Sequence, residues 1–131
     1  LSVKLRYLDA WIRNRQQVAA WYGEFLADSG LTLPAVRPGS THTYHLYVVE
    51  TGDRADLQNR LAEAGVATGI HYPLPLHLQP AFQHLGYSAG AMPVTEAGAP
   101  RILSLPIFPE LTREQVEYIT TVITESVAVK A

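Results

Sequence analysis

The sequence predicts an α+β fold in which helices cover a small antiparallel sheet of about three strands. Apolar residues recur with helical spacing at both ends of the chain, and three short runs between them have the composition of strands. The resulting order is helix, strand, helix, strand, short helices, strand, helix, which favours a layered arrangement. With 131 residues, of which 47% are hydrophobic, the chain has the size and composition of one domain covering residues 1–131.

The first predicted element is a long amphipathic helix near the N-terminus. Its apolar residues recur at steps of three and four, and Gly30 is expected to end it. These apolar residues, whose aromatic members we expect in the core, are Leu5, Leu8, Trp11, Ile12, Val18, Tyr22, Phe25 and Leu26.

The middle of the chain predicts a strand, a helix and a second strand. The run HTYHLYVVE, residues 42–50, is rich in β-branched and aromatic residues and is predicted to be a strand. Asp53 can cap the next helix, and Gly65 can end it. Residues 66–72 are predicted to form the second strand. The apolar stripe of the helix between them consists of Leu57, Leu61 and Ala64.

Short helices are expected after the second strand. Pro80 suits the first position of a helix that ends at Gly86. Residues 92–101 also resemble a short helix, which Gly98 and Pro100 weaken.

The C-terminal part predicts a third strand and a last helix. Residues 102–105 form the apolar run of the strand, and Thr112 with Gln115 makes a capping box that opens the helix. The apolar positions of this helix are Val116, Ile119, Ile123 and Val127.

Composition excludes several classes of partner. The net charge is −2, and the basic residues are spread along the chain without a stripe, so nucleic acid is not expected as a ligand. No apolar run approaches the roughly 18 residues of a membrane span and no signal peptide opens the chain, so a cytoplasmic location is expected.

Because Leu1 already lies inside a helical pattern, we expect the chain to begin partway through a larger protein.

The run GIHYPLPLHLQPAF, residues 69–82, needs an explanation. Its prolines exclude a helix interior and a central strand, and its leucines make it too apolar for a solvated linker. His71 and Tyr72 lie in this stiff segment, where an imidazole and a phenol could hydrogen-bond a polar ligand. They could equally fill a subunit interface or satisfy carbonyl groups of the core.

The residues give little support to other kinds of catalytic, phosphate-binding or metal-binding site. Lys4 and Lys130 are the only lysines, and neither position offers the desolvated pocket that a Schiff-base lysine needs. The chain has no cysteine, no G-x-S-x-G motif and no glycine-rich loop between a strand and a helix. A metal site is disfavoured, because no pair of histidines has a carboxylate at a familiar ligand spacing.

Several runs resemble the C-terminal part of the DegT/StrS-type sugar aminotransferases. These are pyridoxal-phosphate enzymes of the aspartate-aminotransferase fold that make amino sugars on nucleotide carriers. The similar runs are TGIHYPLPLHLQPAF, LGY, PVTE and ILSLPIFPELTREQV, preceded in the right order by KLRYLDAWIRNRQQVAAWY and HTYHLYVV. The PLPLHLQPA variant looks most like the branch that acts at C3 of the sugar.

The resemblance implies that this chain is the small C-terminal domain of a larger enzyme. In the family, the lysine that binds the cofactor, the aspartate beneath its ring and most phosphate contacts come from a large domain that would precede Leu1. This segment then holds no catalytic, cofactor-binding or metal-binding residue, and alone it should not catalyse transamination.

The resemblance also implies the partners and the substrate contacts. The active site would form at a homodimer interface, with glutamate as amino donor and a nucleotide-linked ketosugar as substrate. His71, Tyr72 and His77 would contact this substrate by hydrogen bonds to sugar hydroxyls or to the diphosphate, without abstracting a proton.

Three alternatives remain open at this point. The chain could be a free-standing nucleotide-sugar-binding or regulatory domain, or part of a dehydratase built on the same scaffold. A metal-binding module could use His42, His45, His71 and His77.

Overall fold

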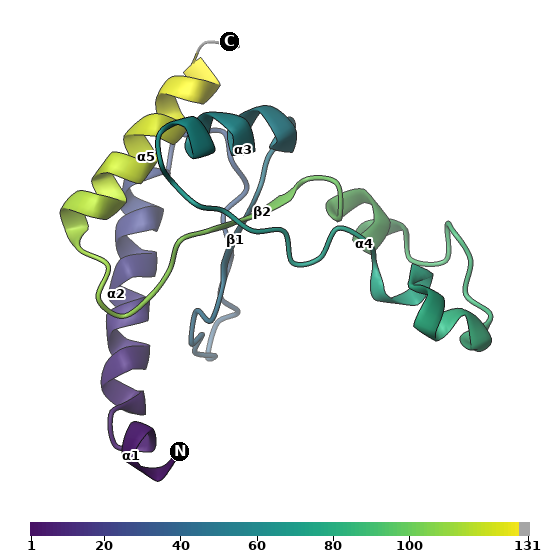
Figure 1. Ribbon diagram of the computed structural model, residues 1–131, viewed down its shortest axis with the longest axis horizontal. Coiled ribbons are helices and arrows are strands. Elements are labelled where there is room, and N and C mark those ends of the chain that lie inside the picture. The colour runs from purple at the N-terminus through teal and green to yellow at the C-terminus, as the bar shows by residue number, and fades with distance from the viewer. Residues whose placement is uncertain (129–131) are drawn as a thin grey trace.

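A computed structural model describes the backbone of residues 1–128 and the side chains of residues 1–126. The predicted α+β arrangement is present (Figure 1). The elements are α1 (Ser2–Leu5), α2 (Leu8–Phe25), β1 (Tyr47–Glu50), α3 (Arg54–Glu63), η1 (Leu76–Leu78), η2 (Pro80–Leu85), α4 (Pro93–Gly98), β2 (Ile102–Leu105) and α5 (Arg113–Ala128), where η marks a 3₁₀ helix.

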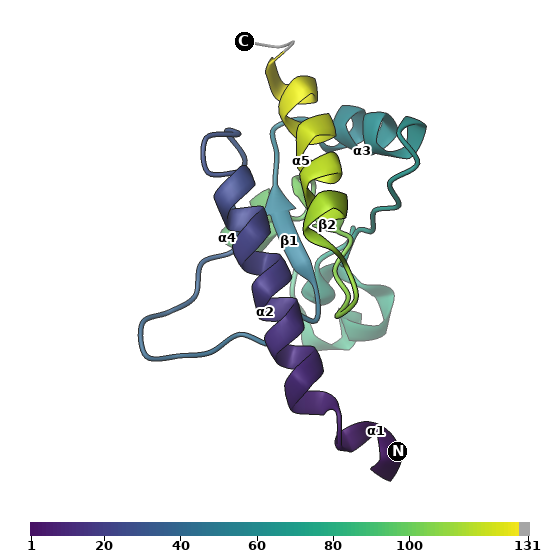
Figure 2. The same ribbon diagram turned by 90° about the vertical axis from the view of Figure 1, so that its left-hand side faces the viewer.

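The sheet lies between two groups of helices. Helices α2 and α5 lie side by side and, with α3, occupy one side of it (Figures 1 and 2). The segment that carries η1, η2 and α4 extends away on the other side (Figure 1). Within the described residues, no helix has the length and apolar character that crossing a membrane requires.

The sheet has two antiparallel strands, not about three. Strands β1 and β2 pair with Tyr47 opposite Leu105 and Glu50 opposite Ile102. Of the strand predicted over residues 66–72, only Gly69 pairs with β2: its N–H donates to the Ser104 carbonyl at 3.1 Å, and the Ser104 N–H donates back at 2.8 Å. The pairing of this segment with β2 is confined to this one bridge.

The strand predicted over residues 42–50 is also shorter than expected. Residues 42–46 lie outside β1, and Tyr44 has a positive φ of 50°. Arg15 on α2 donates to the carbonyls of Tyr44 at 3.2 Å and of Ile107 at 2.8 Å. A guanidinium therefore takes the place of a neighbouring strand as the hydrogen-bond partner of this backbone.

The long N-terminal helix is interrupted near its start and ends earlier than predicted. A short α1 precedes α2, and Leu5 and Leu8 are exposed, contrary to their place in the predicted apolar stripe. Helix α2 ends at Phe25, after which the Ser29 hydroxyl donates to the Leu26 carbonyl at 2.7 Å. Gly30, with φ of 76°, reverses the chain after this turn and does not itself end the helix.

The predicted helix boundaries that depend on local capping are confirmed. Asp53 Oδ1 accepts from the Asp56 N–H at 3.1 Å, and Gly65 has φ of 75° after α3. At the start of α5, the Thr112 hydroxyl accepts from the Gln115 N–H at 3.3 Å, and Gln115 Oε1 accepts from the Thr112 N–H at 3.0 Å. Such reciprocal bonds satisfy N–H groups that a helix start leaves without partners.

Two short helices, η2 and α4, also occur where they were predicted. Pro80 opens η2, Gly86 follows it with φ of 76°, and the helix expected within residues 92–101 is α4, which ends at Gly98.

The core lies between the sheet and helices α2, α3 and α5. Tyr22 is at its centre: its ring stacks on Tyr47 at 4.8 Å between centroids, and its hydroxyl donates to the Pro106 carbonyl at 2.8 Å. Burial raises the pKa of both phenols, that of Tyr47 to about 12. The core residues are Val18, Ala19, Tyr22, Leu26, Tyr47, Val49, Leu57, Leu61, Val66, Leu103, Leu105, Leu111, Val116, Ile119 and Ile123, while Val127 of the predicted stripe lies outside the described side chains.

The capping box of α5 supplies a test of this fold. Replacing Thr112 by Ala removes the acceptor for the Gln115 N–H and should lower the free energy of unfolding by about 1 kcal/mol. Thr112→Ser keeps the hydroxyl and should stay near the parent value. Urea unfolding of the three proteins, followed by far-UV circular dichroism, measures the difference, and equal losses in both variants would contradict the capping role.

Candidate functional site

A pocket of about 320 Å³ separates the extended segment from α4. Residues 71–92, which we call the arm, leave the sheet after Gly69 and reach α4 at Pro93. One wall of the pocket consists of His71, Tyr72, Leu74, Pro75 and Leu76 from the arm, and the other of Val94, Thr95, Gly98 and Ala99. Glu50 and Ile102, at the end of the two strands, complete the lining, so we call this space the arm pocket.

His71 is held at the base of the arm by Ser104. Its Nδ1 lies 2.9 Å from the Ser104 hydroxyl, within hydrogen-bond distance. Gly69 makes this position possible, because a Cβ there would lie 2.7 Å from His71 Cε1. Among the described residues the second ring nitrogen, Nε2, has no hydrogen-bond partner, which leaves it available to a ligand.

Tyr72 presents its side chain next to His71. The two rings meet edge to face, with centroids 5.6 Å apart, and Tyr72 is 64% exposed. The structure thus brings together two of the predicted site residues, one imidazole and one phenol, on the same wall of the arm pocket.

His77 is not part of this pair. It is buried, at 8% exposure, and does not line the arm pocket. Its Nε2 lies 3.0 Å from Glu96 Oε1, and the ring of Tyr87 approaches edge-on at 6.4 Å between centroids. Because an ionised carboxylate only accepts hydrogen bonds, Nε2 carries the proton.

Glu96, the hydrogen-bond partner of His77, is a residue that the sequence did not identify. Its carboxylate accepts the N–H of Gly90 at 2.8 Å and the N–H of Met92 at 3.0 Å, in addition to His77. The available signal was an acidic residue in the first turn after Pro93, which can reach back to the N–H of the residue before the helix.

Hydrogen bonds to Glu96 stabilise its ionised form. The Gly90 and Met92 N–H groups and then the His77 ring lower the Glu96 pKa from 4.5 to about 2. A carboxyl whose pKa is lower in the folded than in the unfolded protein stabilises the fold. This contribution is complete above the unfolded value and is lost as the pH falls toward 2.

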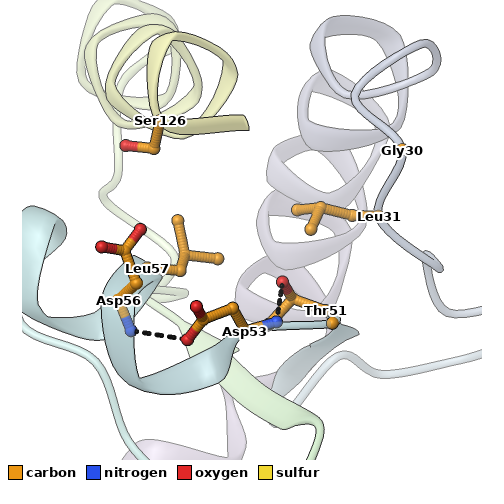
Figure 3. A pocket seen from close by; sticks show the side chains of 8 residues that line it. Gly30, Leu31, Thr51, Asp53, Asp56, Leu57 and Ser126 are labelled. Atoms are coloured by element: carbon orange, nitrogen blue, oxygen red, sulfur yellow. Dashed lines mark hydrogen bonds between the residues drawn. The ribbon is translucent and has the colours of Figure 1, made fainter. Parts of the chain in front are cut away.

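A second hollow lies between α3, α5 and the loop at Gly30 (Figure 3). Its polar groups serve local structure: Asp53 caps α3, Asp56 Oδ2 pairs with Arg60 Nε at 2.9 Å, and the Thr51 hydroxyl accepts the Asp53 N–H at 3.4 Å. This hollow therefore offers a ligand less than the arm pocket does.

No side chain that lines the arm pocket could form a Schiff base with a cofactor. Lys4 is exposed on α1, Lys130 lies outside the described residues, and the lining of the arm pocket includes no lysine or arginine. No group of three or more histidine, aspartate or glutamate side chains within residues 1–126 has the arrangement of a metal site.

A family model and individual known proteins match most of this chain. The family model for the DegT/DnrJ/EryC1/StrS aminotransferase family matches residues 1–124. The erythromycin biosynthesis sensory transduction protein EryC1 of Saccharopolyspora erythraea is 45% identical over 120 residues, which cover 91% of this chain and 33% of that protein. The dTDP-3-amino-3,6-dideoxy-alpha-D-galactopyranose transaminase of Aneurinibacillus thermoaerophilus is 38% identical over 117 residues, covering 89% of this chain and 32% of that protein.

The fold is also found in solved structures. The structure of S. venezuelae DesV in complex with a ketimine intermediate superposes with a TM-score of 0.91 at 35% identity, covering 96% of this chain and 34% of that one. The chain thus spans about a third of the length of the relatives it matches.

The close approach of His71 to Gly69 leads to a prediction. Gly69→Ala should displace the imidazole from Ser104 while leaving the fold intact, since the added Cβ meets only a side chain. Ring nitrogen and carbon chemical shifts of His71, measured by NMR, should move in this variant. In Gly52→Ala, where the added Cβ meets nothing within 4 Å, they should not move. An unmoved His71 signal in Gly69→Ala would contradict the described geometry.

Proposed function

This chain belongs to the DegT/DnrJ/EryC1/StrS aminotransferase family, and we propose that it is the C-terminal small domain of a pyridoxal-phosphate-dependent nucleotide-sugar aminotransferase. The proposed reaction transfers an amino group from glutamate to C3 of a nucleotide-linked ketosugar. The name of the Aneurinibacillus relative, a transaminase for a dTDP-3-amino sugar, supports this choice of substrate class.

The observation that carries the proposal is the His71–Tyr72 pair on the wall of the arm pocket. Both side chains offer polar atoms that the described residues leave without hydrogen-bond partners, and apolar side chains such as Leu74, Leu76 and Val94 line the same pocket. A sugar presents hydroxyls to such groups and carbon–hydrogen faces to such walls.

In this proposal the cofactor supplies the electron sink, and the residues of this chain bind and orient the sugar. The cofactor would be held by a large domain, which the shared family implies and which a second subunit would face across a homodimer interface. His71 Nε2 and the Tyr72 hydroxyl would form hydrogen bonds to sugar hydroxyls or to the diphosphate. Prolines 73 and 75 would keep the segment preformed and so reduce the entropy lost on binding.

A second candidate function is nucleotide-sugar binding without amino transfer. It is favoured by the name of the EryC1 relative, a sensory transduction protein. The enzyme that contains this chain can be tested with dTDP-3-amino-3,6-dideoxy-α-D-galactopyranose and 2-oxoglutarate, the reverse of the proposed reaction. Formation of glutamate supports the aminotransferase. Calorimetric binding of the sugar without glutamate formation would support the second candidate instead.

The role of His71 can be tested in the same assay. In His71→Ala the loss of a hydrogen bond to the substrate should raise the KM of the amino sugar roughly tenfold, because such a bond contributes about 1 kcal/mol or somewhat more. The visible absorbance of the bound cofactor should not change. His45→Ala, an exposed histidine outside the arm pocket, is the matched control. A His71→Ala enzyme with unaltered KM and kcat would remove His71 from the substrate contacts.

A further inference from the structure

We infer that His77 and Glu96 are positioning residues that hold the two walls of the arm pocket together. His77 lies on the arm, directly after the wall that carries His71 and Tyr72, and Glu96 lies on α4, which forms the opposite wall. The bond between them, which we call the wall contact, measures 3.0 Å. This inference rests on the proposed function, because it assigns residues to the same pocket.

The arm depends on the wall contact because few hydrogen bonds among the described residues join it to the rest of the chain. Its own backbone hydrogen bonds are local, such as those from the Leu78 N–H to the Pro75 carbonyl and from the Phe82 N–H to the Gln79 carbonyl. Within the described residues, His71 with Ser104 ties the start of the arm to the sheet. Glu96 ties both its middle, through His77, and its end, through Gly90 and Met92.

Burial indicates that the wall contact is a persistent part of the structure. The side chain of His77 is 7% exposed and that of Glu96 is 21% exposed, so the imidazole is buried and the carboxylate is only partly exposed. A buried polar ring without a partner is costly, and its carboxylate partner is itself fixed by two backbone N–H groups. The Tyr87 ring covers the imidazole from the side.

The position of Tyr72 follows from the two attachments of the arm. Ser104 holds the residue before Tyr72, and the wall contact holds the arm at His77. The prolines at 73 and 75 restrict the backbone between these two points. Loss of the wall contact would free one end of this stiff connection, widen the arm pocket and let Tyr72 move away from α4.

The first test is a ligand-free measurement on the enzyme that contains this chain. Hydrogen exchange of the arm amides, at Leu78, Gln79 and Phe82, reports opening of the arm. In His77→Ala these amides should exchange roughly tenfold faster, while amides of α5 keep their rates. His84→Ala is the matched control, because among the described residues its ring bonds only to the nearby Ala81 carbonyl, at 3.1 Å. Unchanged exchange of the arm amides in His77→Ala would overturn the inference.

The second test is kinetic and uses dTDP-3-amino-3,6-dideoxy-α-D-galactopyranose with 2-oxoglutarate. His77→Ala and Glu96→Ala should each raise the KM of the amino sugar roughly tenfold, while the KM of the oxo acid and the cofactor absorbance stay unchanged. The double variant should be no worse than the poorer single variant, since both changes break the same contact. His77→Gln, which keeps a side-chain N–H, should recover part of the loss.

The outcomes separate this inference from the proposed function. An effect of His77→Ala that adds to that of Glu96→Ala would mean that His77 contacts the sugar directly, and it would overturn the positioning role. A KM that rises in His71→Ala but not in His77→Ala would overturn the wall contact and leave the proposed function standing. If Glu96→Ala does not fold, hydrogen exchange in His77→Ala decides the question alone.

Discussion

The candidate site depends on the two backbone hydrogen bonds that join Gly69 to Ser104. The core fixes β2 by burying Leu103 and Leu105 on either side of Ser104. Ser104 in turn holds Gly69 through its backbone and His71 through its hydroxyl. Because Gly69 has no side chain, the imidazole can fold back over the strand end. The direction in which the arm leaves the sheet is therefore set at this bridge.

Beyond the bridge at Gly69, the arm forms no strand, and its prolines restrict the backbone instead. Prolines lack the N–H donors that a strand ladder would need, and short 3₁₀ helices satisfy part of the backbone locally. At the far end of the arm, Glu96 accepts hydrogen bonds from the N–H groups of Gly90 and Met92. The arm is thus ordered without becoming a strand, and it carries polar ring atoms that the described residues leave to a ligand. A preformed segment of this kind suits our proposal that it contacts a sugar whose reacting carbon lies over a cofactor held elsewhere.

Sequence reasoning succeeded where structure is decided by neighbours along the chain. The caps at Asp53 and Thr112, the turns at Gly65 and Gly86 and the buried stripe of α5 depend on spacing within a few residues. It overestimated the length and number of the strands, because where a strand ends depends on groups that are distant in the sequence. Arg15 donates a hydrogen bond to the carbonyl of Tyr44, 29 residues away in the sequence. The segment after Gly69 forms no bridge to β2 beyond the one at Ser104. The family resemblance grouped His77 with His71 and Tyr72, whereas the hydrogen-bond partner of His77 is Glu96, 19 residues away.

The central proposal is that His71 and Tyr72 contact the nucleotide-sugar directly. The most direct measurement is a titration of the enzyme that contains this chain, with histidine and tyrosine rings isotopically labelled, using dTDP-3-amino-3,6-dideoxy-α-D-galactopyranose. NMR signals of the His71 and Tyr72 rings should shift on saturation, whereas those of His45 and His84, which lie outside the arm pocket, should stay. Saturation of the enzyme with no change at His71 and Tyr72 would contradict the claim.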